Sequence, residues 1–263
     1  MQPKFSRTAI SASIDFLAFG AHPDDIELGC GGTLIRLAQQ GYRTAAVTLT
    51  RGEAGTRGTP EIRQKEFTEA AKIMQVAVHR QLDIPDSAIE ETHENKLKLV
   101  RVIRELRPRL VATVHWESRH PDHIHTAHLV RDAAMIAGLK NLIIEENAHG
   151  SMLEPWRPFR VFYFPERFEV HPSFVVDISA TFEQKMSAVR AHESQFHGPN
   201  MEKYGTEQTS IARPEFLEFI EMKNRRWGAM IGTRYGEAFV VREAVRIDDP
   251  VSAFGEWCRE AIP

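Results

Sequence analysis

The sequence predicts an α/β protein with a Rossmann-like, mostly parallel sheet, helices on both faces and a site at the C-terminal edge of the strands. Short apolar runs of strand type alternate with longer amphipathic stretches of helix type along the chain, and this alternation is typical of parallel α/β folds. Histidines and aspartates follow two of the apolar runs directly. Because parallel strands end at one edge of a sheet, where such folds bind their ligands, we expect these polar residues to meet.

The expected elements follow from apolar periodicity and from the residues that begin or end each run. Gly20 ends the first strand and Gly41 the first helix, while Pro60 begins the second helix and Pro108 ends the third. A polar, glycine-containing stretch at 195–210 predicts a long loop of the functional kind. The strands are expected at 14–20, 44–50, 79–84, 110–115, 160–164, 174–178 and 238–241. The helices are expected at 31–40, 60–76, 94–106, 123–139, 181–192 and 214–231.

Composition and charge are those of a globular enzyme. The chain is 42% hydrophobic and 26% charged, and its formal net charge of −3 argues against broad binding of nucleic acid or membrane surfaces. No apolar run is long enough to span a membrane and the N-terminal segment makes a poor signal peptide, so the cytoplasm is the expected location. We expect a flexible arm at 1–13, one domain at 14–242 and a tail at 243–263. Cys30 and Cys258 are the only cysteines, which excludes a disulfide framework, and Cys30 is expected to be a buried filler rather than a ligand.

Two short polar segments, each following a predicted strand, carry residues suited to a metal-dependent hydrolase. We call them the first crest, 22–25, and the second crest, 119–123. Such an enzyme needs three protein ligands, an open position for water, a carboxylate base, and an acid or oxyanion partner. In the first crest His22 and Asp25 are placed to converge as ligands while Asp24 faces the water. The second crest, 119–123, is able to supply the third ligand, the acid and a carboxylate that orients it. The alternative, a plain turn in which an aspartate caps the following backbone, is disfavoured because both crests follow strands of one sheet.

These crests resemble those of a known family. Ala-His22-Pro-Asp24-Asp25 paired with His120-Pro-Asp122-His123 resembles the LmbE-like/PIG-L family of zinc-dependent N-acetyl-sugar deacetylases. The resemblance covers roughly 14–242, and the stretches that look like its bacillithiol-biosynthesis branch are 49–59, 185–197, 214–218 and 231–239.

The resemblance implies a role for each crest residue. The implied metal ligands are His22, Asp25 and His123, around Zn²⁺ or, as alternatives, iron(II) or another divalent first-row metal. The implied catalytic residues are Asp24 as general base, His120 as acid or oxyanion partner, and Asp122 as the carboxylate that orients an imidazole. The resemblance also implies a homo-oligomer, with a hexamer as the form it suggests.

The implied substrate is N-acetylglucosaminyl-malate, which deacetylation converts to glucosaminyl-malate. Arg63 stands where the family has an arginine near the acetyl and sugar groups, and Tyr204 where relatives have a mobile tyrosine over the pocket. The malate part is a dianion, so we expect Arg51 or Arg57, in the loop at the pocket edge, to bind it. Another N-acetyl-sugar conjugate stays open as the substrate.

Several other polar residues have structural interpretations. His125 and His128 are expected on the surface or in packing, and His115 either in the pocket wall or as a buried hydrogen-bonding group. Glu237 is expected to be a structural partner of a pocket residue.

Three other function classes compete with the hydrolase. A nucleotide-binding oxidoreductase is disfavoured because 29–34 has leucine where the Gly-x-Gly-x-x-Gly fingerprint needs its third glycine. A non-haem iron enzyme would use the same two-His-one-carboxylate set, but Asp24 beside the ligands favours hydrolysis. In a non-catalytic carbohydrate-binding module Asp24 would have no task.

Overall fold

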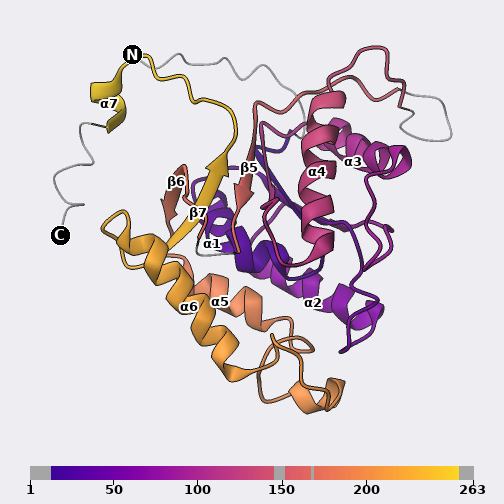
Figure 1. Cartoon of the computed structure of the whole chain (residues 1–263), viewed down its shortest axis with the longest axis vertical. Helices are drawn as coiled ribbons and strands as arrows, with labels where there is room; N and C mark the ends of the chain where they lie inside the picture. The colour runs from indigo at the N-terminus through magenta and orange to yellow at the C-terminus, as the bar shows by residue number, and fades with distance from the viewer. Residues whose placement is uncertain (1–12, 145–151, 167–168, 255–263) are drawn as a thin grey trace.

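The computed structural model describes residues 13–144, 152–166 and 169–254, and it contains one seven-stranded sheet in the order β3-β2-β1-β4-β5-β7-β6 (Figure 1). The strands are β1 (Phe16–Gly20), β2 (Thr44–Thr48), β3 (Val78–Gln81), β4 (Leu110–Val114), β5 (Arg160–Phe164), β6 (Phe174–Asp177) and β7 (Gly236–Val241). The pairs from β3 to β5 are parallel, and β7 runs antiparallel to both β5 and β6. The predicted fold class, α/β with a mostly parallel sheet, is confirmed.

The helices lie in two groups on the sheet. They are α1 (Asp25–Gln39), α2 (Pro60–Ile73), α3 (His93–Leu106), α4 (Pro121–Ile136), α5 (Phe182–Arg190), α6 (Pro214–Ala229) and α7 (Pro250–Phe254), with a short 3₁₀ helix η1 (Met201–Tyr204). Helix α3 packs against α4, whereas α5 packs against α1 and α2, and α6 packs against β7 (Figure 1). In the described part of the chain no helix is long and apolar enough to cross a membrane.

The register of the central strands explains why the two crests meet. Gly20, the last residue of β1, pairs with the last residue of β2, and Phe19 pairs with Thr113 near the end of β4. Every residue of β1 and β2 is buried, as expected for strands covered on both faces. The loops after β1, β4 and β5 therefore leave the same edge of the sheet.

Helix α1 begins six residues earlier than the sequence predicts. Its backbone breaks at Cys30, where φ is −144° and ψ is 17°, so a first helical segment starts at Asp25 and a second follows the break. The glycines here serve close packing as well as turning. A Cβ on Gly29 would lie 2.2 Å from the Phe164 ring, and one on Gly32 would lie 2.9 Å from Ile178.

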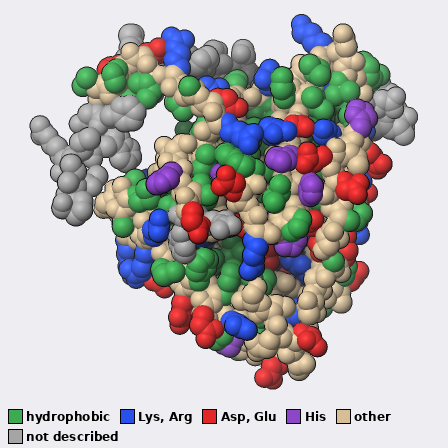
Figure 2. Space-filling view, viewed as in Figure 1, with side chains coloured by type: hydrophobic (Ala, Val, Ile, Leu, Met, Phe, Trp, Pro, Cys, Tyr) green, Lys and Arg blue, Asp and Glu red, His purple; other side chains and the backbone are tan. Residues whose placement is uncertain are grey.

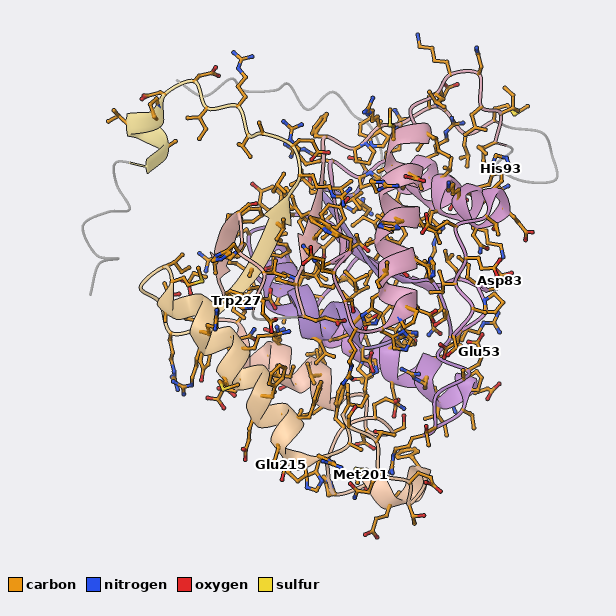
Figure 3. The ribbon with its side chains drawn as sticks, in the orientation of Figure 1. Glu53, Asp83, His93, Met201, Glu215 and Trp227 are labelled. Carbon is orange, nitrogen blue, oxygen red and sulfur yellow. The ribbon has the colours of Figure 1, made fainter. Side chains whose placement is uncertain are left out.

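The remaining boundaries differ from expectation by a few residues. The loop expected at 195–210 contains η1, and α7 lies inside the expected tail. η1 with Met201 and the start of α6 with Glu215 lie at the same end of the molecule (Figure 3). Of the expected arm, 1–12 falls outside the described residues. Charged side chains of both signs are scattered over the face in Figure 2, in keeping with the small net charge.

Candidate metal centre and active site

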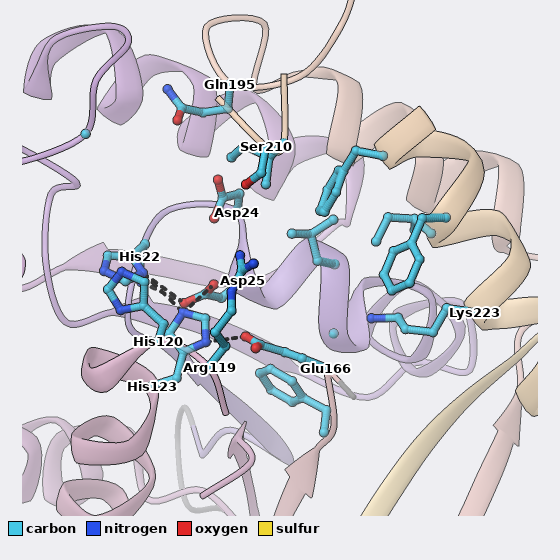
Figure 4. Close-up of a pocket in the computed structure, with 18 of the residues that line it drawn as sticks. His22, Asp24, Asp25, Arg119, His120, His123, Glu166, Gln195, Ser210 and Lys223 are labelled. Carbon is cyan, nitrogen blue, oxygen red and sulfur yellow. Dashed lines mark hydrogen bonds and ion pairs between the residues drawn. The ribbon is translucent and has the colours of Figure 1, made fainter. Parts of the chain in front are cut away.

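A cavity of about 750 Å³ lies at the C-terminal edge of the strands, within the size range of small-molecule sites. The loops after β1, β4 and β5 form one side of it, and α6 with the loop before it forms the other (Figure 4). The residues of the two predicted crests that line it are His22, Asp24, Asp25, Arg119, His120 and His123. The two crests therefore meet in one pocket.

Three side chains bring ligand atoms together. His22 Nδ1 lies 3.3 Å from His123 Nε2 and 3.6 Å from Asp25 Oδ2. His123 Nε2 in turn lies 3.2 Å from Asp25 Oδ1. A tetrahedral zinc ion with nitrogen and oxygen ligands at ~2.0–2.1 Å holds neighbouring ligand atoms about 3.3 Å apart. The residues implied as ligands therefore fit a divalent cation.

The charges around these atoms also suit a cation. Burial lowers the pKa of His22, but hydrogen bonds to Asp122 and Asp86 outweigh it and raise the pKa to about 9. Burial also lowers the pKa of His123, yet the charge of Asp25 and contact with Glu166 raise it well above its ordinary value. Both imidazoles thus sit in a field of carboxylates that favours added positive charge.

The ring of His22 is held by two carboxylates on the side away from the ligand cluster. Its Nε2 lies 3.1 Å from Asp122 Oδ2 and 3.2 Å from Asp86 Oδ1. Asp122 is itself fixed by the backbone amides of Ser87 and Ile89, which donate to it at 2.8 and 3.4 Å. These contacts direct Nδ1 of His22 toward the cluster, as carboxylates behind metal-ligating histidines do.

Glu166 is a site residue that sequence reasoning missed. Its carboxylate contacts Nδ1 of His123, and the Ser118 hydroxyl donates to it at 2.8 Å. Burial raises the pKa of Glu166, but the hydrogen bond and charge of His123 bring it below its ordinary value. Glu166 follows β5 directly at the edge where the crests meet, and this position was the available signal.

A second triplet, His22, His120 and Asp122, also brings ligand-type atoms within 4.8 Å of one another. The polar atoms of this triplet are already hydrogen-bonded to one another and to the backbone. Asp122 accepts hydrogen bonds from two backbone amides and contacts His22 Nε2. His120 Nδ1 accepts the backbone N–H of Asp122 at 3.2 Å. We therefore assign the candidate metal centre to His22, Asp25 and His123.

Asp24 lies beside this centre in a strained backbone conformation. Its φ is 123° and its ψ is −27°, a backbone conformation that residues other than glycine rarely adopt. Burial raises its pKa to about 6, against the opposing charge of Arg63, whose Nη2 lies 3.4 Å from Asp24 Oδ2. Arg63 is held by the carbonyls of Pro23 and Gly52, at 2.8 and 3.0 Å. The result is a buried carboxylate whose position is fixed independently of any ligand.

His120 offers a hydrogen-bond donor to the cavity. Because its Nδ1 accepts the amide of Asp122, the proton of the neutral ring is on Nε2. Burial and then the charges of His22 and His123 lower the pKa of His120, so the neutral form is favoured near pH 7.

The structure places Arg57, one of the two arginines expected to bind the malate part, away from the cavity. Its side chain is 2% exposed and lies outside the cavity lining. Its three nitrogens donate to the backbone carbonyls of Ser194, Glu207 and Met201, at 3.0, 2.6 and 2.5 Å. Arg57 is therefore an anchor for the loop before α6.

Arg51 and Tyr204 are also not brought to the cavity. Arg51 is exposed and lies outside the lining, and the Tyr204 hydroxyl donates to Glu193 at 3.2 Å. Of the predicted substrate-binding residues, only Arg63 lines the cavity.

The remaining polar residues have structural surroundings. Glu237 joins the middle of α1 to Lys185. His125 and His128 both contact Glu91 away from the cavity. His115 is buried, accepts the amide of Glu117 and does not line the cavity, which favours the second of its two expected roles. Cys30 is buried and free.

Comparison with known proteins finds one matching family model and several similar proteins. The model of the PIG-L family, described as GlcNAc-PI de-N-acetylase, matches residues 17–134. The chain is 35% identical over 192 residues to a diacetylchitobiose deacetylase from Thermococcus kodakarensis, covering 68% of this chain and 69% of the relative. It is 28% identical over 189 residues to a probable N-acetyl-α-D-glucosaminyl L-malate deacetylase 2 from Bacillus cereus, covering 66% and 80%. A 4-oxalmesaconate hydratase from Pseudomonas putida is 26% identical over 194 residues, covering 69% and 74%.

Among solved structures, the conserved protein TT1542 from Thermus thermophilus superimposes with a TM-score of 0.77 and 37% identity, covering 89% of this chain and 98% of that one. The family match spans both crests, and the relative at 35% identity extends it over two thirds of both chains. The chain therefore belongs to the PIG-L (LmbE-like) family of deacetylases.

Proposed function

We propose that this protein is a metal-dependent hydrolase that removes the N-acetyl group from an N-acetylglucosaminide. The observation that carries the proposal is the cluster of His22, Asp25 and His123 ligand atoms with the carboxylate of Asp24 beside it in an open cavity. A hydrolase needs this combination, whereas a binding module has no use for a strained, buried base.

Zinc is the proposed metal, because two imidazoles and one carboxylate form a common ligand set for it, and iron(II) is the alternative. When bound, such a cation polarises the acetyl carbonyl and lowers the pKa of water. The residues of the chain then direct the proton transfers.

Asp24 is the proposed general base. It takes a proton from the water whose oxygen attacks the acetyl carbon, and it is suited to this because its pKa is raised to about 6, close to neutral pH. Arg63 keeps the carboxylate in place through its contact with Oδ2. When the C–N bond breaks, the proton goes to the leaving nitrogen, and the products are acetate and the free amine.

His120 is proposed to donate a hydrogen bond from Nε2 to the oxygen that gains negative charge during attack. Its Nδ1 is occupied by the backbone, so the donor is fixed before substrate binds. Asp122 and Glu166 act through His22 and His123, which they orient.

N-acetylglucosaminyl-malate is the substrate we propose within this class, with conversion to glucosaminyl-malate. The similarity to a probable malate-conjugate deacetylase supports it, and so do the cationic side chains of Arg119 and Lys223 in the cavity lining. Diacetylchitobiose is the rival substrate, because a relative of higher identity is named for it.

A panel of N-acetylglucosaminides tests the proposal. Release of free amine is measured on the malate conjugate, diacetylchitobiose and N-acetylglucosamine, with enzyme that is metal-loaded or stripped by chelator. We expect metal-dependent release that is fastest for the malate conjugate. Absence of release from every member by the loaded enzyme would overturn the deacetylase proposal, and faster cleavage of diacetylchitobiose would overturn only the malate assignment.

A further inference from the structure

The cavity wall contributed by α6 takes no part in the proposed chemistry at the acetamide. Phe216, Phe219, Ile220 and Lys223 occur at spacings of three and four residues, which place them on one face of the helix, and all four line the cavity. In Figure 4 this wall lies across the cavity from His22 and His123, and the amino group of Lys223 points inward. One cation is thus set in an otherwise apolar stripe.

Lys223 is buried without a partner. It is only 5% exposed, and within the described residues its amino group makes no hydrogen bond or ion pair. Burial and the nearby charge of Lys185 lower the pKa of Lys223 to about 8, against the opposing effect of Glu166 and Glu237. A buried ammonium is unfavourable unless it is paired, so an anion that enters the cavity would relieve this situation.

The two nearby carboxylates are already committed. Glu237 accepts from the amides of Gly32 and Thr33, from the Thr33 hydroxyl, and from Lys185 Nζ at 2.6 Å. Glu166 is engaged by His123 and Ser118. Among the described residues, neither carboxylate is left to neutralise Lys223, so an anionic ligand in the cavity would supply the missing counter-charge.

We propose that Lys223 is a specificity-determining residue that binds a carboxylate or phosphate carried by the substrate at a point remote from the acetamide. This inference rests on the proposed function. The α6 wall faces the metal centre across the cavity (Figure 4), so with the acetamide at the metal centre the far part of the substrate would extend toward this wall. There Phe216 and Phe219 pack against its apolar faces while Lys223 pairs with its charge. The anion is either an acid in the aglycone or a phosphate on the sugar.

Steady-state kinetics of two Lys223 variants test the proposal. Lys223→Met removes the charge at similar length, and Lys223→Arg keeps it; Lys72→Met, at an exposed position of α2, is the matched control. The charged substrates are N-acetylglucosaminyl-malate and N-acetylglucosamine 6-phosphate, which distinguish the two sources of charge. The uncharged substrates are diacetylchitobiose and methyl N-acetylglucosaminide.

We expect Lys223→Met to lower kcat/KM about 10- to 100-fold for at least one charged substrate, mostly through KM, because one charge-assisted contact is lost. The uncharged substrates should change less than about threefold. Metal content should be unaltered, and the melting temperature should be equal to or above that of wild type, because an unpaired buried charge has been removed. Lys223→Arg should recover part of the loss, and Lys72→Met should behave as wild type. An equal loss on charged and uncharged substrates, or no loss on either, would refute the inference.

Calorimetric binding of malate and of inorganic phosphate supplies a readout that does not depend on turnover. Binding by wild type that is lost in Lys223→Met supports an anion site even if no substrate of the panel is cleaved, in which case the proposed function alone fails. Equal binding by both proteins, or none by wild type, would refute the site while leaving the deacetylase proposal to the panel.

Discussion

Asp24 combines chemical and conformational demands in a single residue. A non-glycine residue at its φ and ψ is strained by ~1–3 kcal/mol, and a buried carboxylate adds a desolvation penalty that Arg63 only partly offsets. Such strain persists where the surroundings determine it, here the Arg63 guanidinium and the helix that starts at Asp25. A carboxylate that is both strained and buried destabilises the fold, and its proposed role as the general base would explain why it is present.

Two substitutions at Asp24 separate these demands. Asp24→Asn keeps the backbone conformation and removes the base, so we expect metal to be retained while the deacetylation rate falls at least ~10²–10⁴-fold. Asp24→Gly also relieves the φ strain, so its free energy of unfolding should exceed that of Asp24→Asn by about 1 kcal/mol. Metal analysis, amine release and urea unfolding measure the three quantities. Activity of Asp24→Asn within a few-fold of wild type would argue against its role as the base.

The candidate site residues predicted from the sequence are clustered in short motifs, whereas those that the sequence analysis missed are isolated in the chain. His22, Asp25 and His123 lie in the two crests after strands, so their residue types and spacing predict a metal centre. Glu166 and Lys223 stand singly, and only the fold brings them to the cavity. The sequence places Arg57 in a loop at the pocket edge, which makes it a candidate for binding an anionic substrate. The sequence alone does not show whether its guanidinium contacts a ligand or backbone carbonyls, and in the structure it contacts carbonyls.

At the scale of elements, the sequence predicts which segments are helix or strand better than where they end or what their loops do. Apolar periodicity was sufficient for β1, α3 and β5, whose patterns are strong. The start of α1 was not predicted because Gly29, Gly31 and Gly32 resemble a turn, whereas two of them allow close packing with Phe164 and Ile178. The sequence predicts that the loop at 195–210 is functional, and in the structure Arg57 holds its backbone in place through the carbonyls of Met201 and Glu207.

Arg57 and Arg51 form a matched pair for testing this anchor. Arg57→Ala leaves three backbone carbonyls without their donor, so we expect a loss of about 3 kcal/mol or more in the free energy of unfolding. Arg57→Lys should recover little, because one ammonium cannot reproduce the fork. Arg51→Ala, at an exposed side chain, should change stability by less than about 0.5 kcal/mol. Chemical denaturation measures all three, and equal stability of the two alanine variants would contradict the anchoring role.

At the scale of the whole molecule, the topology of the sheet forms the candidate site. The proposed ligands come from the segment that joins β1 to α1 and from the start of α4, about one hundred residues apart in the chain. The parallel register of β1 with β4 brings these segments together before any side chain is considered. Metal binding should therefore couple to the stability of the entire fold.

Thermal and chemical unfolding with and without metal test this coupling. A ligand at 100 times its Kd stabilises the native state by about 2.7 kcal/mol, and we expect a gain of this order for wild type with zinc. Asp24→Asn should gain as much, because it keeps all three ligands, whereas His123→Ala should gain little. Full stabilisation of His123→Ala by zinc would show that the ligand set is wrong.

The contacts of Glu237 affect the order in which parts of the fold form as the chain is synthesised. The neighbours of β1 in the sheet are β2 and β4, so its pairing is complete once residue 114 has been synthesised. The break at Cys30 leaves the amides of Gly32 and Thr33 to be bound by a carboxylate that lies 205 and 204 residues further along. Contacts of such sequence separation are slow to form. The amides in the middle of α1 and the buried Lys185 therefore gain their carboxylate partner only after β7, the last strand of the sheet, has been synthesised.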